Sequence, residues 1–193
     1  MNHAQRAMWE ARHRDAAPGA PEPSLLAILP AILRLMPHGL VLDVAAGTGR
    51  NALVLAEAGC RVIAVDYATT AMHTIAEAAR AAHLPITPVV ADLESTLPFQ
   101  PARFDCVVNI NYLDRDRVSH LKDLLRVGGL FFFDTFLIDQ ATLGHPRDPR
   151  FLLQRYELRA MLSDMELLHY GEGLVNYKAD KSAWRATALA RKG

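Results

Sequence analysis

The feature that most constrains the fold is the segment at residues 40–51, where an aliphatic run stops at two glycines and a helical pattern starts at once. We interpret it as a strand, a tight loop and a helix. Gly47 and Gly49 lack a Cβ, so the loop can adopt positive φ angles and a ligand can lie against bare backbone. The helix that follows points unpaired N–H groups at such a ligand. The segment therefore predicts an α/β fold with a ligand site at this loop.

Acidic residues accompany three consecutive predicted strands. Asp43 lies within the first strand, Asp66 follows residues 62–65, and Asp92 follows residues 88–91. In open α/β sheets the carboxyl ends of the strands form one edge, and ligands bind at that edge. A carboxylate in an apolar strand is costly to bury unless a donor or a cation lies nearby, so Asp43 predicts such a group beside it.

Length and composition indicate one domain. A chain of 193 residues fits a single core, and Lys plus Arg equals Asp plus Glu at 21 each, so no broad basic face for nucleic acid is expected. The most apolar segment, residues 25–36, is too short to span a bilayer, and the first 14 residues contain no apolar signal core. We expect a cytoplasmic protein that binds neither nucleic acid nor membrane. Cys60 and Cys106 lack metal-ligand spacing, so we expect buried thiols and no metal site.

The chain divides into an N-terminal arm with a linker, residues 1–23, and one domain, residues 24–193. The arm has helical propensity but little apolar surface, and the prolines within residues 18–23 end its helical pattern. Trp9 and Arg12 either dock the arm through one aromatic side chain or belong to a flap that closes over a ligand. The sequence leaves both open.

Apolar periodicity predicts strands and helices along the domain. After the strand that begins at residue 40, the expected strands are residues 62–65, 88–91, 104–110, 130–133, 166–173 and 183–190, the last two as an antiparallel pair. The first expected helix is residues 25–33, capped by Ser24 and kinked or restarted at Pro30. A later helix starts at Thr69 or Thr70 and runs to about residue 83, and the helix at residues 116–125 is expected to end at Gly128 and Gly129. Two further helices are expected at residues 50–58 and 155–162. Residues 139–150 are expected to form a long loop over the ligand edge, where loops usually carry specificity.

The glycine loop fits two kinds of nucleotide site. Residues 47–52 satisfy the pattern G-x-G-x-x-A, and Asp66 lies 66 − 47 = 19 residues after Gly47, as in dinucleotide-binding folds. However, Asp43 would repel a pyrophosphate and attract an ammonium. Asp92 supplies an acceptor for an exocyclic amine, and the chain has no second domain for a hydride acceptor. A ligand with an ammonium, a ribose and an aminopurine fits the three acids in order, and S-adenosylmethionine has these groups.

In order and spacing, these motifs resemble those of class I S-adenosylmethionine-dependent methyltransferases. The segments that carry the resemblance are residues 42–51, 65–67, 91–93, 104–105 and 125–129, and the likeness extends roughly from residue 25 to the C-terminus. Within the class, the chain is most similar to small tellurite-resistance-type (TehB-like) methyltransferases, through residues 47–51, 111–115 and 144–147. The resemblance implies a Rossmann-like, doubly wound, mostly parallel sheet of seven strands whose last strand is antiparallel.

The resemblance also implies which residues bind the cofactor S-adenosylmethionine. Asp43 and the backbone of residues 45–49 would face its methionine part, and Asp66 its ribose hydroxyls. Tyr67 would cover the adenine face, and Asp92 with Leu93 the adenine edge. The full expected set is Asp43, Ala45, Gly47, Thr48, Gly49, Asn51, Asp66, Tyr67, Asp92, Leu93 and Asn109. Ala45 stands where the family usually has its first loop glycine, a departure that tightens the loop.

The sulfonium is already an activated methyl donor, so the protein mainly has to align a nucleophile and exclude water, and we assign no catalytic residue. Residues 109–112 read Asn-Ile-Asn-Tyr rather than Asn-Pro-Pro-Tyr, which argues against methylation of a nucleobase or glutamine amide nitrogen. We expect a small-molecule acceptor, lined by Tyr112, with Arg12, His145 and Arg147 over it, an arrangement that suits a small anionic or soft molecule. In the alternative, Tyr112 is an ordinary half-buried aromatic residue and the loop residues are solvated.

Two other functions stay open. A non-catalytic protein that binds S-adenosylmethionine or S-adenosylhomocysteine would share every cofactor residue, and an NAD-dependent oxidoreductase would share the glycine pattern. The acceptor atom and the oligomeric state cannot be read from the residues.

Overall fold

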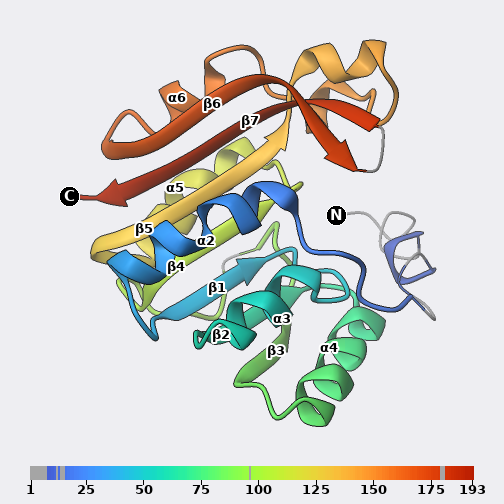
Figure 1. Ribbon diagram of the computed structural model, residues 1–193, viewed down its shortest axis with the longest axis vertical. Helices are drawn as coiled ribbons and strands as arrows, with labels where there is room; N and C mark the ends of the chain where they lie inside the picture. Colours follow the sequence, from blue (N-terminus) through green and yellow to red (C-terminus); the bar gives the residue numbers. More distant parts are fainter. Residues whose placement is uncertain (1–7, 12, 14–15, 96, 179–180) are drawn as a thin grey trace.

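The computed structural model describes residues 8–11, 13, 16–95, 97–178 and 181–193. Its centre is a seven-stranded sheet with the order β3-β2-β1-β4-β5-β7-β6 (Figure 1). The strands are β1 (Leu40–Val44), β2 (Arg61–Asp66), β3 (Ile86–Val90), β4 (Phe104–Ile110), β5 (Leu125–Phe136), β6 (Met165–Lys178) and β7 (Lys181–Lys192). Strands β1 to β5 pair in parallel, whereas β7 is antiparallel to both β5 and β6. Six strands therefore point one way and the last points the other, as expected.

Helices cover both faces of the sheet (Figure 1). They are α2 (Pro23–Leu35), α3 (Arg50–Glu57), α4 (Thr69–Ala81), α5 (Val118–Asp123) and α6 (Glu157–Met161), with short 3-10 helices η1 (Arg115–Arg117), η2 (Ile138–Thr142) and η3 (Pro149–Phe151). Helices α2, α3 and α4 pack on one face, and α5 and α6 on the other. This confirms the Rossmann-like, doubly wound prediction. None of the helices in the described part of the chain is long and apolar enough to cross a membrane.

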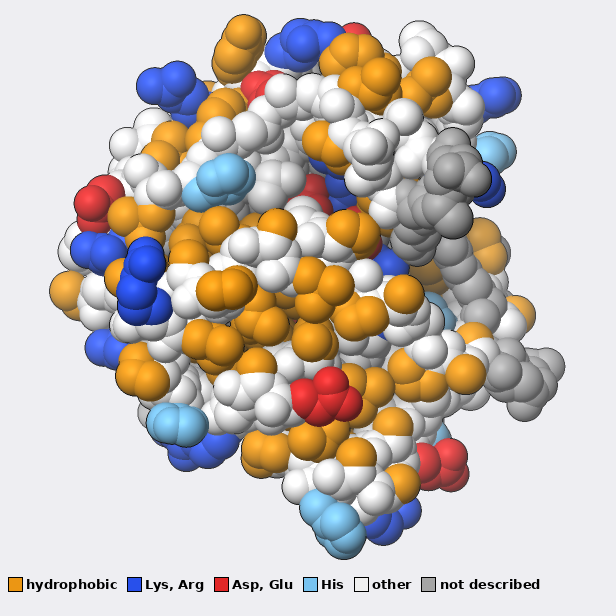
Figure 2. All heavy atoms as spheres, in the orientation of Figure 1, with side chains coloured by type: hydrophobic (Ala, Val, Ile, Leu, Met, Phe, Trp, Pro, Cys, Tyr) orange, Lys and Arg blue, Asp and Glu red, His pale blue; other side chains and the backbone are white. Residues whose placement is uncertain are grey.

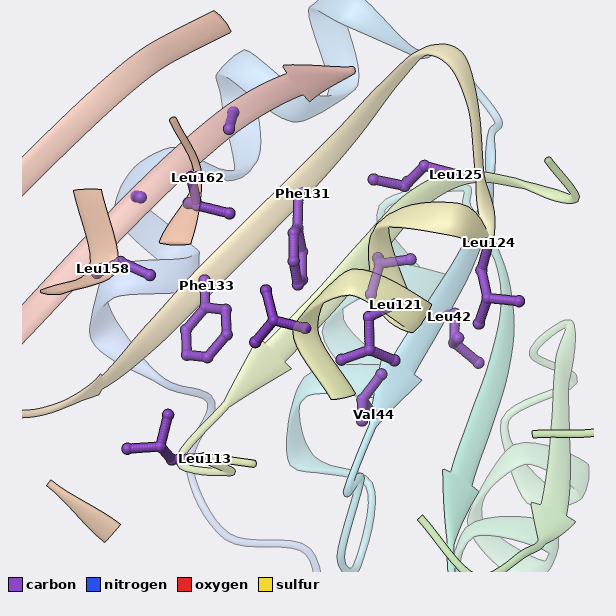
Figure 3. Close-up of a cluster of buried hydrophobic side chains, with 14 of the residues drawn as sticks. Leu42, Val44, Leu113, Leu121, Leu124, Leu125, Phe131, Phe133, Leu158 and Leu162 are labelled. Carbon is purple, nitrogen blue, oxygen red and sulfur yellow. The ribbon is translucent and has the colours of Figure 1, made fainter. Parts of the chain in front are cut away.

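Strand β5 shows how the sequence builds a core on each face. Successive side chains of a strand point to opposite faces. Phe131 and Phe133 join the cluster beneath α5 and α6, whereas Leu130 and Phe132 join the cluster beneath α2, α3 and α4. Figure 3 shows the rings of Phe131 and Phe133 near leucine side chains such as Leu121 of α5. Because β5 is covered on both faces, its apolar run is unbroken.

The start of α2 differs from the prediction. Ser24 is not the N-cap but the second residue of the helix, and its hydroxyl donates to the carboxylate of Asp134 on β5. The N-cap is Glu22, which makes no side-chain cap, and Pro23 takes the first helical position, where its missing N–H costs nothing. The helix runs through Pro30 without a break or a restart.

The cap of α4 also differs. Its N-cap is Ala68, so neither Thr69 nor Thr70 caps the helix with its own side chain. The cap comes from the N-terminal arm instead. The carboxylate of Glu10 accepts hydrogen bonds from the N–H groups of Thr69 (2.8 Å) and Thr70 (3.3 Å). A carboxylate there also lies favourably at the positive end of the helix dipole.

The predicted helix at residues 116–125 is shorter than expected. Helix α5 ends at Asp123, and β5 begins two residues later, so Gly128 and Gly129 lie inside a strand rather than after a helix. The register between β4 and β5 shifts there, and the backbone turns tightly. Gly128 has φ +75°, and a Cβ on Gly129 would lie 2.8 Å from the carbonyl oxygen of Arg126. The glycines permit this irregularity rather than ending the helix.

Candidate functional site

The loop between β1 and α3 bends through left-handed backbone conformations. Ala45 and Gly47 both have φ +54°, and Gly49 has φ +89°. A Cβ on Gly49 would lie 2.5 Å from Cγ1 of Ile75 in α4, so only glycine fits there. Ala45 adopts its left-handed angle at a cost of about 1–2 kcal/mol. The loop therefore presents backbone to the carboxyl edge of the sheet, as the sequence predicted.

Asp43 is buried beneath this loop. Its side chain is 1% exposed, and among the described residues its Oδ2 has no hydrogen-bond partner. Burial raises the pKa of Asp43 to about 7, against the opposing attraction of the Arg50 guanidinium. A buried carboxylate oxygen without a donor is costly, and a cationic ligand group would relieve that cost.

Asp66, the last residue of β2, joins two backbone segments. Its Oδ2 accepts a hydrogen bond from the N–H of Gly47, and its Oδ1 accepts one from the N–H of Ala68, both at 3.0 Å. The carboxylate is 7% exposed. Each carboxylate oxygen has two lone pairs, so these bonds leave room for a further donor such as a ribose hydroxyl.

The remaining predicted cofactor residues lie along the same edge. Thr48 and Tyr67 are half-buried and Leu93 is buried. Asp92 follows β3, and its Oδ1 accepts a hydrogen bond from the N–H of Glu94 at 3.0 Å.

Two predicted cofactor residues, Asn51 and Asn109, are buried and hold other parts of the chain. Oδ1 of Asn51 accepts the N–H of Glu22 at 3.0 Å and fixes the linker to the start of α3. Asn109, fully buried at the end of β4, donates through Nδ2 to the carbonyl of Tyr112 at 2.7 Å. Both side chains thus shape the site, and Oδ1 of Asn109 has no hydrogen-bond partner among the described residues. Their contact with the cofactor stays a prediction.

Tyr112 lies in the segment after β4, half-buried. Its hydroxyl donates to Oδ2 of Asp114 at 3.4 Å. Burial raises the pKa of Tyr112, and the Asp114 carboxylate raises it further. The phenol is therefore protonated at neutral pH and can act as a hydrogen-bond donor but not as a base.

The N-terminal arm reaches the glycine loop. Arg12 lies outside the described residues, but its neighbours Trp9 and His13 stack their rings 5.9 Å apart. A Cβ on Gly47 would lie 3.3 Å from Cε1 of His13. With Glu10 bound at the start of α4, the arm lies between α4 and the glycine loop.

His145 and Arg147 lie on the segment between η2 and η3, after β5. Both side chains are exposed. Gln140 anchors this segment to the sheet. Its Nε2 donates to the carbonyl of His145 at 3.1 Å, and its Oε1 accepts the N–H of Trp184 on β7 at 2.9 Å.

A buried ion network escaped the sequence analysis. Arg185 on β7 is 3% exposed and donates through Nε to Oδ1 of Asp134 at 3.0 Å. Its Nη2 lies 3.7 Å from Oε1 of Glu22, whose Oε2 accepts from Nη2 of Arg50 at 2.7 Å. Asp134 and Arg185 interrupt apolar strand patterns, which is the signal that could have found them. Glu22 stands in a proline-rich linker and gives no such signal.

Within the described residues no cluster of three or more His, Cys, Asp or Glu side chains could hold a metal ion. Cys60 and Cys106 are both free and buried. Burial raises the pKa of each thiol.

Comparison with known proteins agrees with this geometry. Residues 41–129 match the family model of a methyltransferase domain. TehB from Haemophilus influenzae is similar in structure, with a TM-score of 0.73 and 25% identity over 86% of this chain and 62% of TehB. The chain thus spans less than two thirds of that protein.

Two other solved structures share the fold. One is a structure that describes the conversion of a disulfide bond into a thioacetal group during echinomycin biosynthesis. It has a TM-score of 0.77 and 22% identity over 97% of this chain and 92% of its own. A SAM-dependent methyltransferase from Methanosarcina mazei has a TM-score of 0.69 and 19% identity over 84% of this chain and 97% of its own. No curated protein matches the sequence.

Proposed function

We propose that this chain is a class I S-adenosylmethionine-dependent methyltransferase and that it methylates a small molecule. The observation that carries the proposal is the combination of a glycine loop with positive φ angles and, beneath it, a buried carboxylate oxygen of Asp43 that no described residue hydrogen-bonds.

The residues at the edge of the sheet fit the cofactor of this class. Asp43 offers a negative oxygen to a positively charged group, and the positive φ angles of Gly47 and Gly49 turn the loop backbone toward the edge of the sheet. Asp66 has lone pairs left for hydroxyl donors, and Asp92 lies beyond it after β3. When bound, S-adenosylmethionine supplies an activated methyl group.

The chain's own task is then to orient the acceptor and exclude water. Tyr112 holds its proton at neutral pH, and its O–H would turn from Asp114 to donate to the acceptor. The arm at the glycine loop and the segment after β5 would cover the site from two sides. Arg12, His145 and Arg147 remain proposed acceptor contacts.

Two observations support a small acceptor. The chain carries equal numbers of basic and acidic residues, which gives no charged platform for nucleic acid. The segment after β4 lacks the proline pair of enzymes that methylate nucleobase or amide nitrogens.

The test is methyl transfer from labelled S-adenosylmethionine to size-separated fractions of a cell extract. We expect label in a low-molecular-mass product, formed in proportion to the protein added. Label in protein or nucleic acid would contradict the small-molecule acceptor. Tight binding of S-adenosylhomocysteine without transfer to any fraction would instead indicate a non-catalytic binder. Binding of NAD with no heat from S-adenosylhomocysteine would indicate an oxidoreductase.

A further inference from the structure

Asn111 has a strained backbone at the edge of the sheet where an acceptor would lie. It directly follows β4, is exposed, and has φ +59°, a left-handed angle that asparagine tolerates better than most residues. Its N–H donates to the carbonyl of Asp134 at 2.9 Å, so the surrounding strands hold this conformation. Backbone strain of this kind is kept at sites where a side chain must point in a required direction.

The side chain of Asn111 is held by a buried arginine. Its Oδ1 accepts a hydrogen bond from Nη1 of Arg185 at 2.7 Å. Arg185 is itself fixed, by Asp134 and by the rings of Phe136 and Tyr177, whose centroids lie 4.2 and 5.0 Å from its guanidinium carbon. Burial alone would lower the pKa of Arg185, but Asp134 and Glu22 raise it, so the group stays charged.

This contact determines which half of the amide faces outward. A guanidinium carries only donors, so the amide oxygen must face Arg185. The nitrogen Nδ2 lies on the other branch of an exposed side chain and therefore points away from the buried arginine. The edge of the sheet presents an N–H donor at this position and not an acceptor.

The same network reaches the cofactor loop. Glu22 lies between Arg185 and Arg50, and Arg50 is the first residue of α3, directly after Gly49. Figure 2 shows a hollow on this face, between α2 and the β6–β7 hairpin of Figure 1, with acidic and basic side chains at its bottom. The two arginines are balanced by Glu22 and Asp134, so these four side chains together carry no net charge.

We propose that Asn111 binds the methyl acceptor by donating a hydrogen bond from its side-chain amide to an oxygen atom of that molecule, and that Arg185 positions that amide. The inference rests on the proposed function. It adds to the proposed function that the acceptor carries an oxygen atom able to accept a hydrogen bond.

The test variant is Asn111→Asp, which keeps an oxygen for Arg185 and tolerates the left-handed angle but replaces the amide donor by a carboxylate oxygen. A purely structural role would survive this change. The matched control is Asn176→Asp, the same change at an exposed position on β6. Arg185→Lys keeps the buried charge but loses the rigid fork that orients the amide. The probe is the low-molecular-mass extract fraction that accepts label.

For Asn111→Asp we expect the half-saturating concentration of that fraction to rise about three- to tenfold, the range that corresponds to one lost hydrogen bond. The melting temperature and the Kd for S-adenosylhomocysteine should stay near those of the unmodified protein, and Asn176→Asp should change nothing. Arg185→Lys should raise the same half-saturating concentration.

Unchanged acceptor saturation in Asn111→Asp would overturn the inference while leaving the proposed function intact. Weaker binding of S-adenosylhomocysteine in that variant would overturn it too, because Asn111 would then serve the cofactor. If the unmodified protein labels no small molecule, the proposed function fails and the inference falls with it.

Discussion

Oδ2 of Asp66 accepts a hydrogen bond of 3.0 Å from the backbone N–H of Gly47, so the end of β2 fixes the conformation of the glycine loop after β1. The two residues lie 19 apart in sequence, Asp66 at the end of β2 and Gly47 in the loop that follows the neighbouring parallel strand β1. One carboxylate thereby has two tasks: to hold the loop and, in the proposed function, to bind the ribose hydroxyls.

The double task of Asp66 predicts a graded effect on cofactor binding. Asp66→Ala should weaken S-adenosylhomocysteine binding by about 1–3 kcal/mol, the range for lost hydrogen bonds to a charged group. Asp66→Asn keeps one acceptor oxygen, so its loss should be smaller. Titration calorimetry measures both, with Asp164→Asn, an exposed carboxylate bound to Lys122, as the matched control. A Kd unchanged by Asp66→Ala would refute the ribose assignment.

The raised pKa of Asp43 predicts how stability depends on pH. Between about pH 4 and its folded pKa of about 7, the folded protein binds more protons at Asp43 than the unfolded chain does. The free energy of unfolding should therefore fall as pH rises through this window, by up to about 1.4 kcal/mol per pH unit from this group. Asp43→Asn should remove that component. Urea denaturation at several pH values gives the pH dependence of the free energy of unfolding for the unmodified protein and for Asp43→Asn. Equal slopes in the two proteins would show that the pKa of Asp43 is not raised by folding.

The position of Gly49 predicts a large cost for one methyl group. Gly49→Ala forces a side chain into a left-handed conformation and against Ile75, so it should destabilise the fold by about 2–4 kcal/mol. The control is Gly144→Ala, where a Cβ has no heavy atom within 4 Å, with an expected change within about 0.5 kcal/mol. Equal stability of the two variants in denaturant unfolding would mean that the loop can relax around the methyl group.

The contact between the arm and α4 predicts a change in amide exchange. Burial would raise the pKa of Glu10, but hydrogen bonds from Thr70 and Thr69 lower it below its ordinary value. The arm should therefore be fully docked on α4 when the pH lies above the ordinary pKa of a glutamate. This docking should be lost as the pH falls through the lowered pKa of Glu10 in the folded protein. Glu10→Gln should speed hydrogen exchange at the Thr69 and Thr70 amides, whereas Glu77→Gln, exposed in the middle of α4, should not. Equal exchange in both variants would mean that the arm does not cap α4.

Local signals predicted most of the fold correctly. The apolar run and glycines of residues 40–51 indicated β1, its loop and α3, because strand period, positive φ and helix start are all decided within a few residues. The predicted N-caps of α2 and α4 were wrong because the contacts at these helix starts come from residues far away in the sequence. Nothing near Thr69 reveals that a carboxylate 59 residues earlier would supply the cap, and nothing near Ser24 reveals its contact with Asp134.

By itself the sequence determined the order of the elements, the two apolar faces of the sheet and the row of acids at its carboxyl edge. Only the tertiary structure decided which polar groups meet there. The Arg185 network joins four segments far apart in the chain, and it turns the amide of Asn111 outward. The physical reason is that a buried charge is stabilised by whichever partners packing brings within about 3 Å, and local pattern carries no information about those partners.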